Sequence, residues 1–580
     1  MAYKFIKFIQ KIIIRLPEPL LVLLGGFTGI IFYSSGKRRH LAFKNIKSIF
    51  PGKNNQEIIS IIRKNFSLFA MSLIESLIAP RLYGRVKIKG CLDKLQEGGI
   101  CVGIHSGSWE LINCFLAQKY KYAILAQNQK QEHFDRFLNE LRKKEGMQVC
   151  FSIKELIKCI KSNYLIGMVI DQGVEDDALA VNFFNHIVPT PRGAVYLARK
   201  FNKKIYPCFS YREKGLSFRL EVGKPIEAAD KSDQEVLSHL NRLYEDYLTK
   251  NPWEYYWCFK RFKYKLNRKV VVLSDGKSGH HKQSQALVSF LKNSKFQIDS
   301  QTVDIKYKSK YLRLLADILA LFCPRQTLIA FRYLSLFLTK ESFESLKNIY
   351  ADIVISTGSY SAAINRFLSS YLGAKSAVIL RPNISLSKFD LAIIPEHDRV
   401  FADNAVIIKG ALFYPDKLAE KAQRCKKFFN LSDNKKIALF LGGPVNESNE
   451  FMDNFKLLMP KLKDLAIKNN YRVLISTSRR TPEEGQEHIK KEFKLFSLTE
   501  ALVIANETNH DFVFEGFSSL ADIVFVTGES ISMVTEIASM GKSCVCLFME
   551  AQDNKRKLFL NSMSSGITFI EKPYHFENLK

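Results

Sequence analysis

A repeated pattern in the second half of the chain limits the fold more than any other feature. The segment ADIVISTGSYS at 351–361 is similar to ADIVFVTGESIS at 521–532. Each segment follows, at a distance of about 80 residues, another apolar run that ends in glycine: VVVLSDGKSG from Val270 and IALFLGGP from Ile437. Two matched pairs of strands with glycine-rich turns predict two similar lobes, each built on a parallel sheet.

The first half also alternates strand-like and helix-like stretches, which predicts an α/β fold throughout. Its apolar runs include ICVGIH, YLIGMVID, KKIYPCFSY and LSFRLEVG, and it closes with NPWEYYWCFKRFKYK before a new strand starts at Lys269. We therefore predict a helical segment, an α/β domain, and two Rossmann-like lobes whose cleft, at the carboxyl ends of the strands, is the expected ligand site. The predicted bounds are 1–36, 37–265 and 268–580, with lobes at about 268–415 and 430–560.

Charge and cysteine usage narrow the classes of partner. The 86 Lys and Arg exceed the 57 Asp and Glu by 29, which favours binding to anionic lipid, nucleic acid or acidic carriers. No arginine-rich arm, zinc-finger spacing or RNP-like strand is present, so nucleic acid is not expected as a partner. The 11 cysteines show no C-x-x-C pattern, which predicts reduced thiols, a cytoplasmic compartment and no metal site.

The N-terminus is expected to associate with a membrane. Its first 16 residues carry a basic stripe beside aromatic and aliphatic side chains, the composition of an interfacial helix. The next apolar run, from Leu20 to Tyr33, is shorter than the roughly 20 residues that a clean span requires. It is therefore expected to dip into the bilayer or barely cross it, and an ordinary core helix is the alternative. The basic stripe consists of Lys4, Lys7, Lys11 and Arg15.

The segment CVGIHSGSWELINCF at 101–115 places a histidine at the end of a strand and a glutamate in the first turn of a helix. Histidine suits a general base because its unperturbed pKa lies near neutrality. We interpret His105 as this base and Glu110 as the carboxylate that orients its ring. The alternatives are a hydrogen-bonded core histidine and a glutamate that favours the helix dipole. Cys101 is expected to be an inert core thiol.

Several ordered motifs make residues 37 to about 263 similar to the lipid A biosynthesis (lauroyl/myristoyl) acyltransferase family, within the lysophospholipid acyltransferase group. The motifs are KRRHLAFKNIKSIFP, HSGSWEL, FLNELRKKEG, IGMVIDQ, VNFFNHIVPTPRGAVYLAR and YYWCFKRFK. The resemblance implies an acyltransferase that moves a fatty acyl chain from a carrier thioester to a lipid hydroxyl. It implies catalytic roles for His105, Glu110, Arg142 and Asp171, and substrate contacts from Gln172, Ser108, Thr190 and Gly193.

One departure from the family bears on the acceptor. Family members often carry an arginine and an asparagine after the helix of the dyad, where this chain has Gln127 and Gln131. Glutamine, which has no charge, would contact a phosphosugar more weakly than arginine does. A lipid A precursor is therefore the leading acceptor, and a lysophospholipid or another glycolipid is the alternative.

Residues 268 to about 560 resemble the bacterial proteins related to the mitochondrial-fission ELM proteins. The matching stretches are SDGKSGHHKQSQAL, LGGP, STSRRTP and TGESISMVTEIASMGKS. The resemblance implies a GT-B-type fold with a nucleotide-sugar site, and packing alone is the alternative explanation for its glycines. His280 and His281 are interpreted as a polar loop, and Arg479 and Arg480 face either a diphosphate or water. The predicted nucleotide-sugar residues are Gly276, Gly279, Gly442, Gly443, Gly528, Ser530, Ser532 and Glu536.

Together these features predict a bifunctional enzyme at the cytoplasmic face of the bacterial inner membrane. Its expected partners are membrane lipid and acyl carrier protein. Acyl-ACP or acyl-CoA is the expected co-substrate, a nucleotide sugar is a second one, and no resident cofactor is expected. Two other functions stay open at this point: a glycolipid glycosyltransferase dominated by the second half, and a non-catalytic membrane adaptor.

Overall fold

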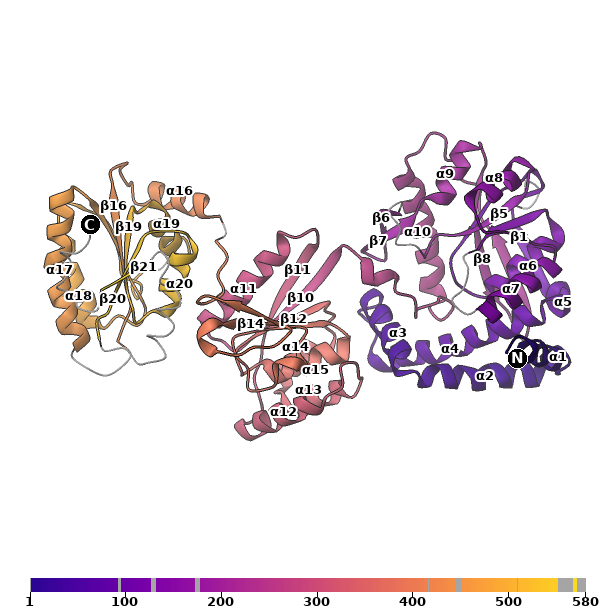
Figure 1. Ribbon diagram of the computed structural model, residues 1–580, viewed down its shortest axis with the longest axis horizontal. Helices are drawn as coiled ribbons and strands as arrows, with labels where there is room; N and C mark the ends of the chain where they lie inside the picture. Colours follow the sequence, from indigo (N-terminus) through magenta and orange to yellow (C-terminus); the bar gives the residue numbers. More distant parts are fainter. Residues whose placement is uncertain are drawn as a thin grey trace.

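The computed structural model describes residues 2–91, 95–126, 132–172, 178–415, 417–444, 450–508, 510–550 and 567–570. Figure 1 shows three α/β units in chain order, the first on the right and the last on the left. The first unit has a seven-stranded sheet and each of the other two a six-stranded sheet. The predicted fold class, an α/β domain followed by two Rossmann-like lobes, is confirmed.

Five helices precede the first sheet, and two of them pack through glycine. A Cβ on Gly25 would lie 2.0 Å from Met71 Sδ, and one on Gly29 would lie 2.6 Å from Ser67 Cα. The absence of side chains at these positions therefore lets α2 lie directly on α4. Asn54 caps α4 in a reciprocal capping box with Glu57. The helices are α1 (Ala2–Ile13), α2 (Glu18–Ser34), α3 (Gly36–Ile49), α4 (Asn55–Leu77) and α5 (Ala79–Leu82).

Many of the bulky apolar side chains of α1, α2 and the turn between them are exposed, whereas Ile13 and Leu21 are buried. Helix α2 buries Leu21, Gly25 and Gly29, so it is not the core helix that the alternative interpretation described. Within the described residues no single helix is long and apolar enough to cross a bilayer, and two helix pairs bent by 89° and 99°, α2 with α3 and α4 with residues 79–85, meet the length and composition criteria. The exposed apolar residues are Phe8, Ile9, Ile12, Ile14, Leu20, Val22, Leu23, Phe27, Ile30 and Ile31.

The seven-stranded sheet has the order β1-β9-β8-β2-β5-β3-β4, and all of its pairs are parallel except β8 with β9. Its strands are β1 (Val86–Gly90), β2 (Gly99–Gly103), β3 (Tyr122–Leu125), β4 (Gln148–Cys150), β5 (Leu165–Val169), β8 (Ile205–Arg212) and β9 (Phe218–Val222). A separate hairpin joins β6 (Ala178–Phe183) to β7 (His186–Pro191). The helices of this unit are α6 (Trp109–Lys119), α7 (Glu132–Lys144), α8 (Ile153–Lys161), α9 (Gly193–Lys200) and α10 (Asp233–Lys250).

The middle lobe is a wholly parallel sheet with the order β11-β10-β12-β13-β14-β15. Because β11 lies on one side of β10 and β12 on the other, the chain reverses its direction across the sheet between β10 and β12. The strands are β10 (Asn267–Ser274), β11 (Gln297–Asp304), β12 (Ile353–Thr357), β13 (Lys375–Ile379), β14 (Leu391–Pro395) and β15 (Ala405–Ile408). The helices are α11 (Ser278–Lys292), α12 (Lys310–Phe322), α13 (Ala330–Phe337), α14 (Lys340–Lys347) and α15 (Ala362–Leu372).

The last lobe is also wholly parallel, with the order β18-β17-β16-β19-β20-β21. Numbered from its own first strand, this is the Rossmann order 3-2-1-4-5-6, with its switch point between β16 and β19. The strands are β16 (Lys436–Leu441), β17 (Arg472–Thr477), β18 (Thr499–Val503), β19 (Ile523–Thr527), β20 (Cys544–Leu547) and β21 (Ile567–Ile570). The helices are α16 (Leu418–Phe428), α17 (Glu450–Asn469), α18 (Glu483–Phe493), α19 (Val513–Leu520) and α20 (Ile531–Ser539).

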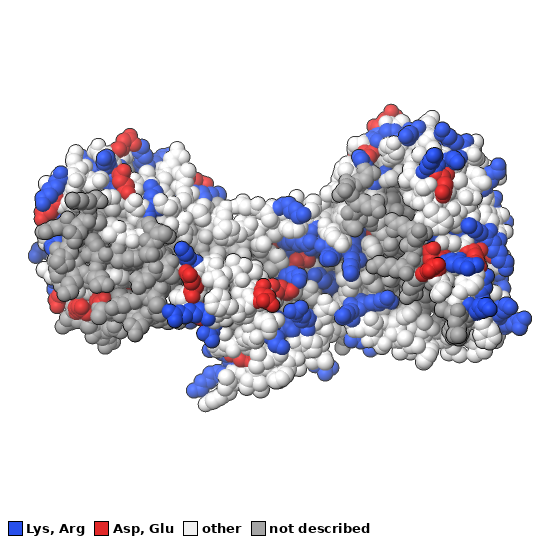
Figure 2. Space-filling model, viewed as in Figure 1, with Lys and Arg blue, Asp and Glu red and all other residues white. Residues whose placement is uncertain are grey.

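The first unit and the middle lobe share one core. The rings of Phe43 on α3 and Tyr371 on α15 lie 5.4 Å apart between centroids, and one cluster of buried apolar side chains continues through both units. A buried ion pair joins Lys265 Nζ to the Asp352 carboxylate at 2.8 Å. Figure 2 shows that Lys and Arg side chains gather on the surface at this junction.

Replacement of Gly29 by leucine should separate α2 from α4, because the new side chain would overlap the backbone of Ser67. We expect the Gly29→Leu protein to lose about 1–3 kcal/mol of unfolding free energy, the usual effect of overpacking. Gly26→Leu is the matched control, since a Cβ at Gly26 meets nothing within 4 Å. Urea unfolding measures the stability of both variants, and equal unfolding midpoints would contradict this account of the α2–α4 contact.

Candidate functional site

Strand register brings His105 next to Asp171. Strands β2 and β5 are parallel neighbours in which Gly103 pairs with Val169. Ile170 N donates to Gly103 O at 3.1 Å, which continues the pairing past the end of both strands. His105 and Asp171 each stand two residues beyond the last paired position. They therefore meet at the carboxyl edge of the sheet, where open α/β folds place their ligands.

His105 and the Asp171 carboxylate make two hydrogen bonds, one through the imidazole and one through the backbone. His105 Nδ1 lies 2.9 Å from Asp171 Oδ1, and the backbone N–H of His105 donates to Oδ2 at 3.0 Å. The Asp171 side chain is 1% exposed and the His105 side chain 20% exposed. A buried carboxylate paired in this way fixes the ring orientation and leaves Nε2 available to abstract a proton.

The two groups also hold each other in their charged forms. Burial lowers the pKa of His105, but the charges of Asp171 and, to a smaller extent, Glu110 outweigh it and raise the pKa above its ordinary value. Burial raises the pKa of Asp171, but the interaction with His105 outweighs it and keeps that pKa below its ordinary value. The pair is therefore an electrostatically coupled acid–base unit.

Glu110 takes a different place from the one predicted. In the first turn of α6 its carboxylate pairs with Arg142, in the last turn of α7: Arg142 Nε donates to Oε2 at 3.2 Å, and Nη2 donates to Oε1. The hydrogen-bond partner of His105 is Asp171, so the interpretation of Glu110 as that partner is corrected. Glu110 acts on His105 through charge alone.

A tight loop follows His105 and is held by the aromatic segment that closes the domain. Gly107 has a φ of +62°, and a Cβ there would lie 2.7 Å from Ser210 Oγ, so only glycine fits. Gly107 N donates to Glu254 O, Tyr256 N donates to His105 O, and Ser106 pairs with Tyr255 across an isolated bridge. The closing segment, which the sequence identified only as a family motif, thus fixes the loop that carries the base.

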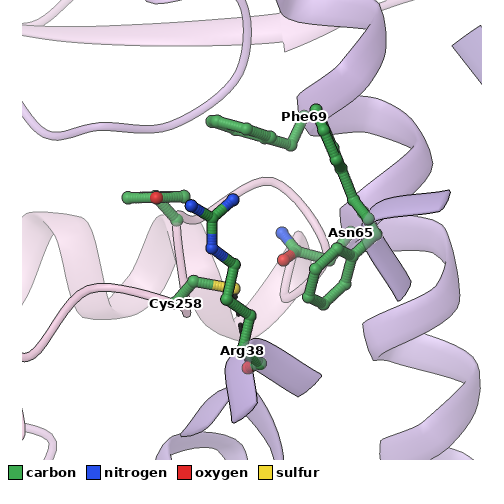
Figure 3. A pocket seen from close by; sticks show the side chains of 7 residues that line it. Arg38, Asn65, Phe69 and Cys258 are labelled. Atoms are coloured by element: carbon green, nitrogen blue, oxygen red, sulfur yellow. Dashed lines mark hydrogen bonds between the residues drawn. The ribbon is translucent and has the colours of Figure 1, made fainter. Parts of the chain in front are cut away.

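A hollow of about 200 Å³, lined in part by Gly107 and Trp109, lies beside this loop. A larger one of about 250 Å³ shares Asn65, Phe69 and Tyr256 with it, and both volumes include space open to solvent. The Phe69 ring stacks on Tyr256 at 4.8 Å between centroids and on Trp109 at 6.1 Å, and Trp109 meets the His105 ring edge-on. Figure 3 shows Arg38 extending into the larger hollow, between Asn65 and Cys258 and toward Phe69. An aromatic wall therefore leads from the catalytic ring toward α2.

Two buried arginines belong to this region and were missed from the sequence. Arg212 contacts the carboxylates of Glu75 and Glu254, with Nη2 to Glu75 Oε2 at 2.8 Å, and it lines the smaller hollow. Arg261 is 3% exposed and its charge lowers the pKa of Asp171. The only available signal was the position of Arg261 in the closing basic and aromatic motif.

The remaining predictions for the first unit have different outcomes. Ser108 is fully buried, and within the described part of the chain its hydroxyl has no hydrogen-bond partner. Thr190 Oγ1 accepts from Arg261 at 3.4 Å, whereas Gly193 begins α9 next to Met168. Gln172 is half-buried directly after Asp171. Gln127 and Gln131 lie outside the described residues.

The Cys101 thiol is not a competing nucleophile, because a hydrogen bond with Cys208 and burial raise its pKa well above the ordinary value.

The predicted residues of the last two lobes lie at the carboxyl ends of strands, in two groups. Gly276 and Gly279 follow β10, and a Cβ at either would meet nothing within 4 Å. Gly442 and Gly443 are packed instead: Gly442 N donates to Thr527 Oγ1 at 2.7 Å, and a Cβ at Gly443 would lie 1.9 Å from Arg480 O. For these two glycines the packing alternative is correct.

The rest of the last-lobe set surrounds the start of α20. Gly528 lies against Phe548, and Ser530 caps the helix with a largely buried side chain. Ser532 Oγ donates to Glu536 at 2.6 Å, so both side chains already bind each other. Arg479 and Arg480 are exposed. Among the described residues no cluster of three or more His, Cys, Asp and Glu side chains has the arrangement of a metal site.

Comparison with protein families accounts for almost the whole chain. Residues 3–264 match the family of bacterial lipid A biosynthesis acyltransferases, and residues 278–568 match the mitochondrial fission ELM1 family. The ELM1 match spans half of the chain, so the chain belongs to that family. The first half, which contains the His105–Asp171 pair, is similar to the lipid A acyltransferases, and this similarity supports acyltransferase activity; we call it the acyltransferase half.

Individual relatives agree with this division. The acyltransferase half is 24% identical over 267 residues to the lipid A biosynthesis palmitoleoyltransferase of Escherichia coli and to the lipid A biosynthesis acyltransferase of Shigella flexneri, covering 43% of this chain and 87% of each relative. Among solved structures, this chain is similar to the UDP-GlcNAc 2-epimerase of Neisseria meningitidis, with 15% identity and a TM-score of 0.31 over 53% of this chain and 88% of that one. It is also similar to a family 9 glycosyl transferase of Veillonella parvula, with 11% identity and a TM-score of 0.30 over 52% of this chain and 87% of that one. Scores this low support no conclusion about substrate.

The pKa of His105 gives the acyltransferase half a defined pH dependence. With the neutral ring as the expected base, activity should be lost as the pH falls through this raised pKa. Asp171→Asn removes the negative charge that does most to raise the pKa of His105. Burial then lowers that pKa, so the acidic limb of the kcat/KM profile should move to lower pH. Glu110→Gln should move it in the same direction by less.

The matched control is Glu227→Gln, which removes a carboxylate whose side chain is 71% exposed and pairs with Lys204. Its pH profile should coincide with that of the wild type. An acidic limb that stays in place in Asp171→Asn would disprove the electrostatic coupling of Asp171 to His105.

Proposed function

We propose that the acyltransferase half moves a fatty acyl chain from acyl carrier protein or acyl-CoA to a hydroxyl of a lipid A precursor. The observation that carries this proposal is the His105–Asp171 pair, whose imidazole ring meets Trp109, a residue that lines the smaller hollow. The family supplies the class of reaction, and the names of its relatives supply the class of acceptor. A lysophospholipid or another glycolipid is the second candidate acceptor.

In this reaction His105 Nε2 takes the proton of the acceptor hydroxyl while Asp171 holds Nδ1. The acceptor oxygen attacks the thioester carbonyl, and the tetrahedral intermediate collapses as its carbon–sulfur bond breaks. The thiolate leaves with the electron pair and receives the proton back from the imidazolium. The hydroxyl of Ser108 is a suitable donor to the oxyanion. It is buried three residues after His105 and has no hydrogen-bond partner among the described residues.

Arg142 and Glu110 support this chemistry as a pair. The bidentate contact fixes both side chains, which are 13% and 14% exposed, and so fixes the position of the Glu110 carboxylate. The negative charge of Glu110 raises the pKa of His105 and favours the imidazolium that forms during proton transfer. In this assignment Arg142 is a positioning residue that acts through Glu110.

The surroundings of the site suit a lipid substrate at a bilayer surface. The apolar faces of α1 and α2 would enter the membrane, and the net charge of +29 would favour anionic lipid and an acidic carrier protein. Arg38, at the α2 end of the larger hollow, would meet a lipid phosphate. We accordingly place the protein at the cytoplasmic face of the bacterial inner membrane.

A second function is proposed for the ELM1 half: binding of a nucleotide sugar in the cleft between its two lobes. The observation in favour is that each of the two sheets has a switch point in its strand order, and that Lys282 on α11 and Glu536 on α20 form an ion pair between the lobes at 3.2 Å. Ligands of open α/β sheets bind at such switch points. The candidate contacts are Gly276, Gly279, Ser530 and Glu536.

Loss of the base should abolish acyl transfer without unfolding the protein. We expect His105→Ala to lower turnover by at least about a hundredfold, the scale of general-base loss. The measurement is release of free thiol from acyl carrier protein and acyl-CoA in the presence of lipid acceptors, with the product lipid identified by mass spectrometry.

His239→Ala is the matched control, since it removes an exposed imidazole on α10 and should leave turnover unchanged. A folded His105→Ala protein with near-normal turnover would rule out the assignment of the base. Product formation on a lysophospholipid but not on a lipid A precursor would correct the acceptor alone.

A further inference from the structure

The ELM1 half contains a second imidazole–carboxylate pair. His280 Nδ1 lies 2.8 Å from Asp275 Oδ2. The Asp275 side chain is 2% exposed and that of His280 is 24% exposed, almost the values of Asp171 and His105. Asp275 Oδ1 also accepts from Lys277 N at 3.2 Å, so the carboxylate is held from both sides. The prediction that His280 is part of a polar loop is therefore wrong: its ring is oriented, and Nε2 is the free nitrogen.

This second pair stands at the switch point of the middle lobe. Asp275 directly follows β10 and His280 lies in the first turn of α11. A Cβ on Gly358, which follows β12, would lie 2.9 Å from His280 Cε1, so the ring lies against the end of the neighbouring strand. The position between β10 and β12 is the place where an open α/β sheet receives its ligand.

The last lobe contacts α11 close to this pair. Lys282, two residues beyond His280 on α11, reaches Glu536 on α20, and α20 begins directly after β19. The N-terminus of α20 carries the partial positive charge that suits a phosphate group. A nucleoside diphosphate at α20 would thus place the sugar that it carries toward the middle lobe, where His280 lies.

We propose that His280 is the general base of a glycosyl-transfer centre in the ELM1 half, with Asp275 as its positioning residue. This inference rests on the proposed nucleotide-sugar function of that half. His280 Nε2 accepts the proton of an acceptor hydroxyl, whose oxygen forms a bond to the anomeric carbon of the sugar. The bond from that carbon to the phosphate oxygen breaks, and the nucleoside diphosphate leaves with the electron pair. Water serves as the acceptor when no other hydroxyl is present.

The test uses the full chain and a panel of UDP-, GDP- and ADP-sugars. Calorimetry measures binding, and release of the nucleoside diphosphate with water as acceptor measures turnover. We expect His280→Ala to lower kcat by at least about a hundredfold with little change in KM, and added imidazole to restore part of it. Asp275→Asn should lower kcat, again with KM retained. His281→Ala, which removes the exposed neighbouring imidazole, is the control and should behave as the wild type.

The outcomes separate this inference from the function on which it rests. If the wild type binds no nucleotide sugar, both are overturned. If it binds and turns one over while His280→Ala does so equally well, or if imidazole restores nothing to a folded and binding His280→Ala protein, the base assignment alone is overturned. Acyl transfer at His105 should be unchanged in all three variants.

An independent observation concerns helix α12 of the middle lobe, which buries small and polar residues and exposes large apolar ones. Its buried residues are Ala316, Asp317 and Ala320. Leu312, Leu319 and Leu321 pack partly against the core, but several other large apolar residues point outward, with Leu314 63% and Phe322 76% exposed. A helix of a soluble domain normally buries such side chains, so this face fits an apolar partner. The exposed apolar residues of this surface, which we name the α12 face, are Tyr311, Leu314, Leu315, Ile318, Phe322, Ile329 and Leu336.

The charge around the α12 face identifies the partner as a lipid surface. From Ile305 to Lys340 the chain has one acidic residue, the buried Asp317, and seven basic ones. Apolar side chains within a basic surround match an anionic bilayer. In Figure 1, α12 and α13 lie along the same lower edge of the molecule as α2, whose apolar face is also exposed. The basic residues are Lys306, Lys308, Lys310, Arg313, Arg325, Arg332 and Lys340.

We infer that the α12 face binds the same anionic bilayer as α1 and α2, so that the middle lobe lies on the membrane beside the acyltransferase half. The full-length Leu314→Glu/Ile318→Glu protein should partition at least about tenfold more weakly onto phosphatidylglycerol–phosphatidylcholine vesicles in a sedimentation assay. The control, Leu457→Glu/Leu495→Glu, changes two exposed leucines of the last lobe and should partition as the wild type.

Circular dichroism establishes that both double variants are folded. Equal partitioning of the α12 variant and the wild type would overturn the inference. The inference would also be overturned, in favour of a protein–protein interface, by one further result. In that result the variant binds vesicles normally, and light scattering shows that the wild type self-associates whereas the variant does not.

Discussion

The buried contact between Asp171 and His105 is the interaction on which the acyltransferase site depends. A carboxylate with 1% exposure is costly unless it is paired, and here the imidazole and the backbone N–H of His105 supply the pairing. The β2–β5 register aligns the two residues, and the closing segment fixes the loop that joins His105 to α6. The acid–base geometry therefore follows from sheet pairing, which is rigid, and not from a mobile loop.

The sequence predicted the fold better than the partners within the site. Alternating strands and glycine turns fix α/β lobes locally, and that prediction is confirmed. The partner of His105 depended instead on which strand lies beside β2. Glu110 was the nearest carboxylate in the sequence, whereas Asp171, 66 residues away, is the nearest in space. Sequence spacing contains no information about strand order, so neither that pair nor the contact of Arg142 with Glu110 followed from it.

The same limit explains the second pair and the misjudged glycines. Asp275 and His280 are five residues apart, but only the strand order β11-β10-β12 places them at a switch point and the ring against Gly358. Gly442 and Gly443 fit a phosphate-loop pattern, yet they allow close approach to Thr527 and to the carbonyl of Arg480. A glycine after a strand thus indicates a close backbone approach, and the structure decides whether a ligand or the protein approaches it.

The shared core of the acyltransferase half and the middle lobe gives the fusion a physical consequence. Phe43, Tyr371 and the Lys265–Asp352 pair join the two units through buried contacts rather than through a flexible linker. Each unit also presents large apolar side chains at the surface, on α1 and α2 in one and on α12 in the other. Two rigidly joined apolar faces bind a bilayer more tightly than either alone, because the second contact pays no further translational cost. In such an arrangement a lipid modified at one centre stays in the same membrane plane as the other.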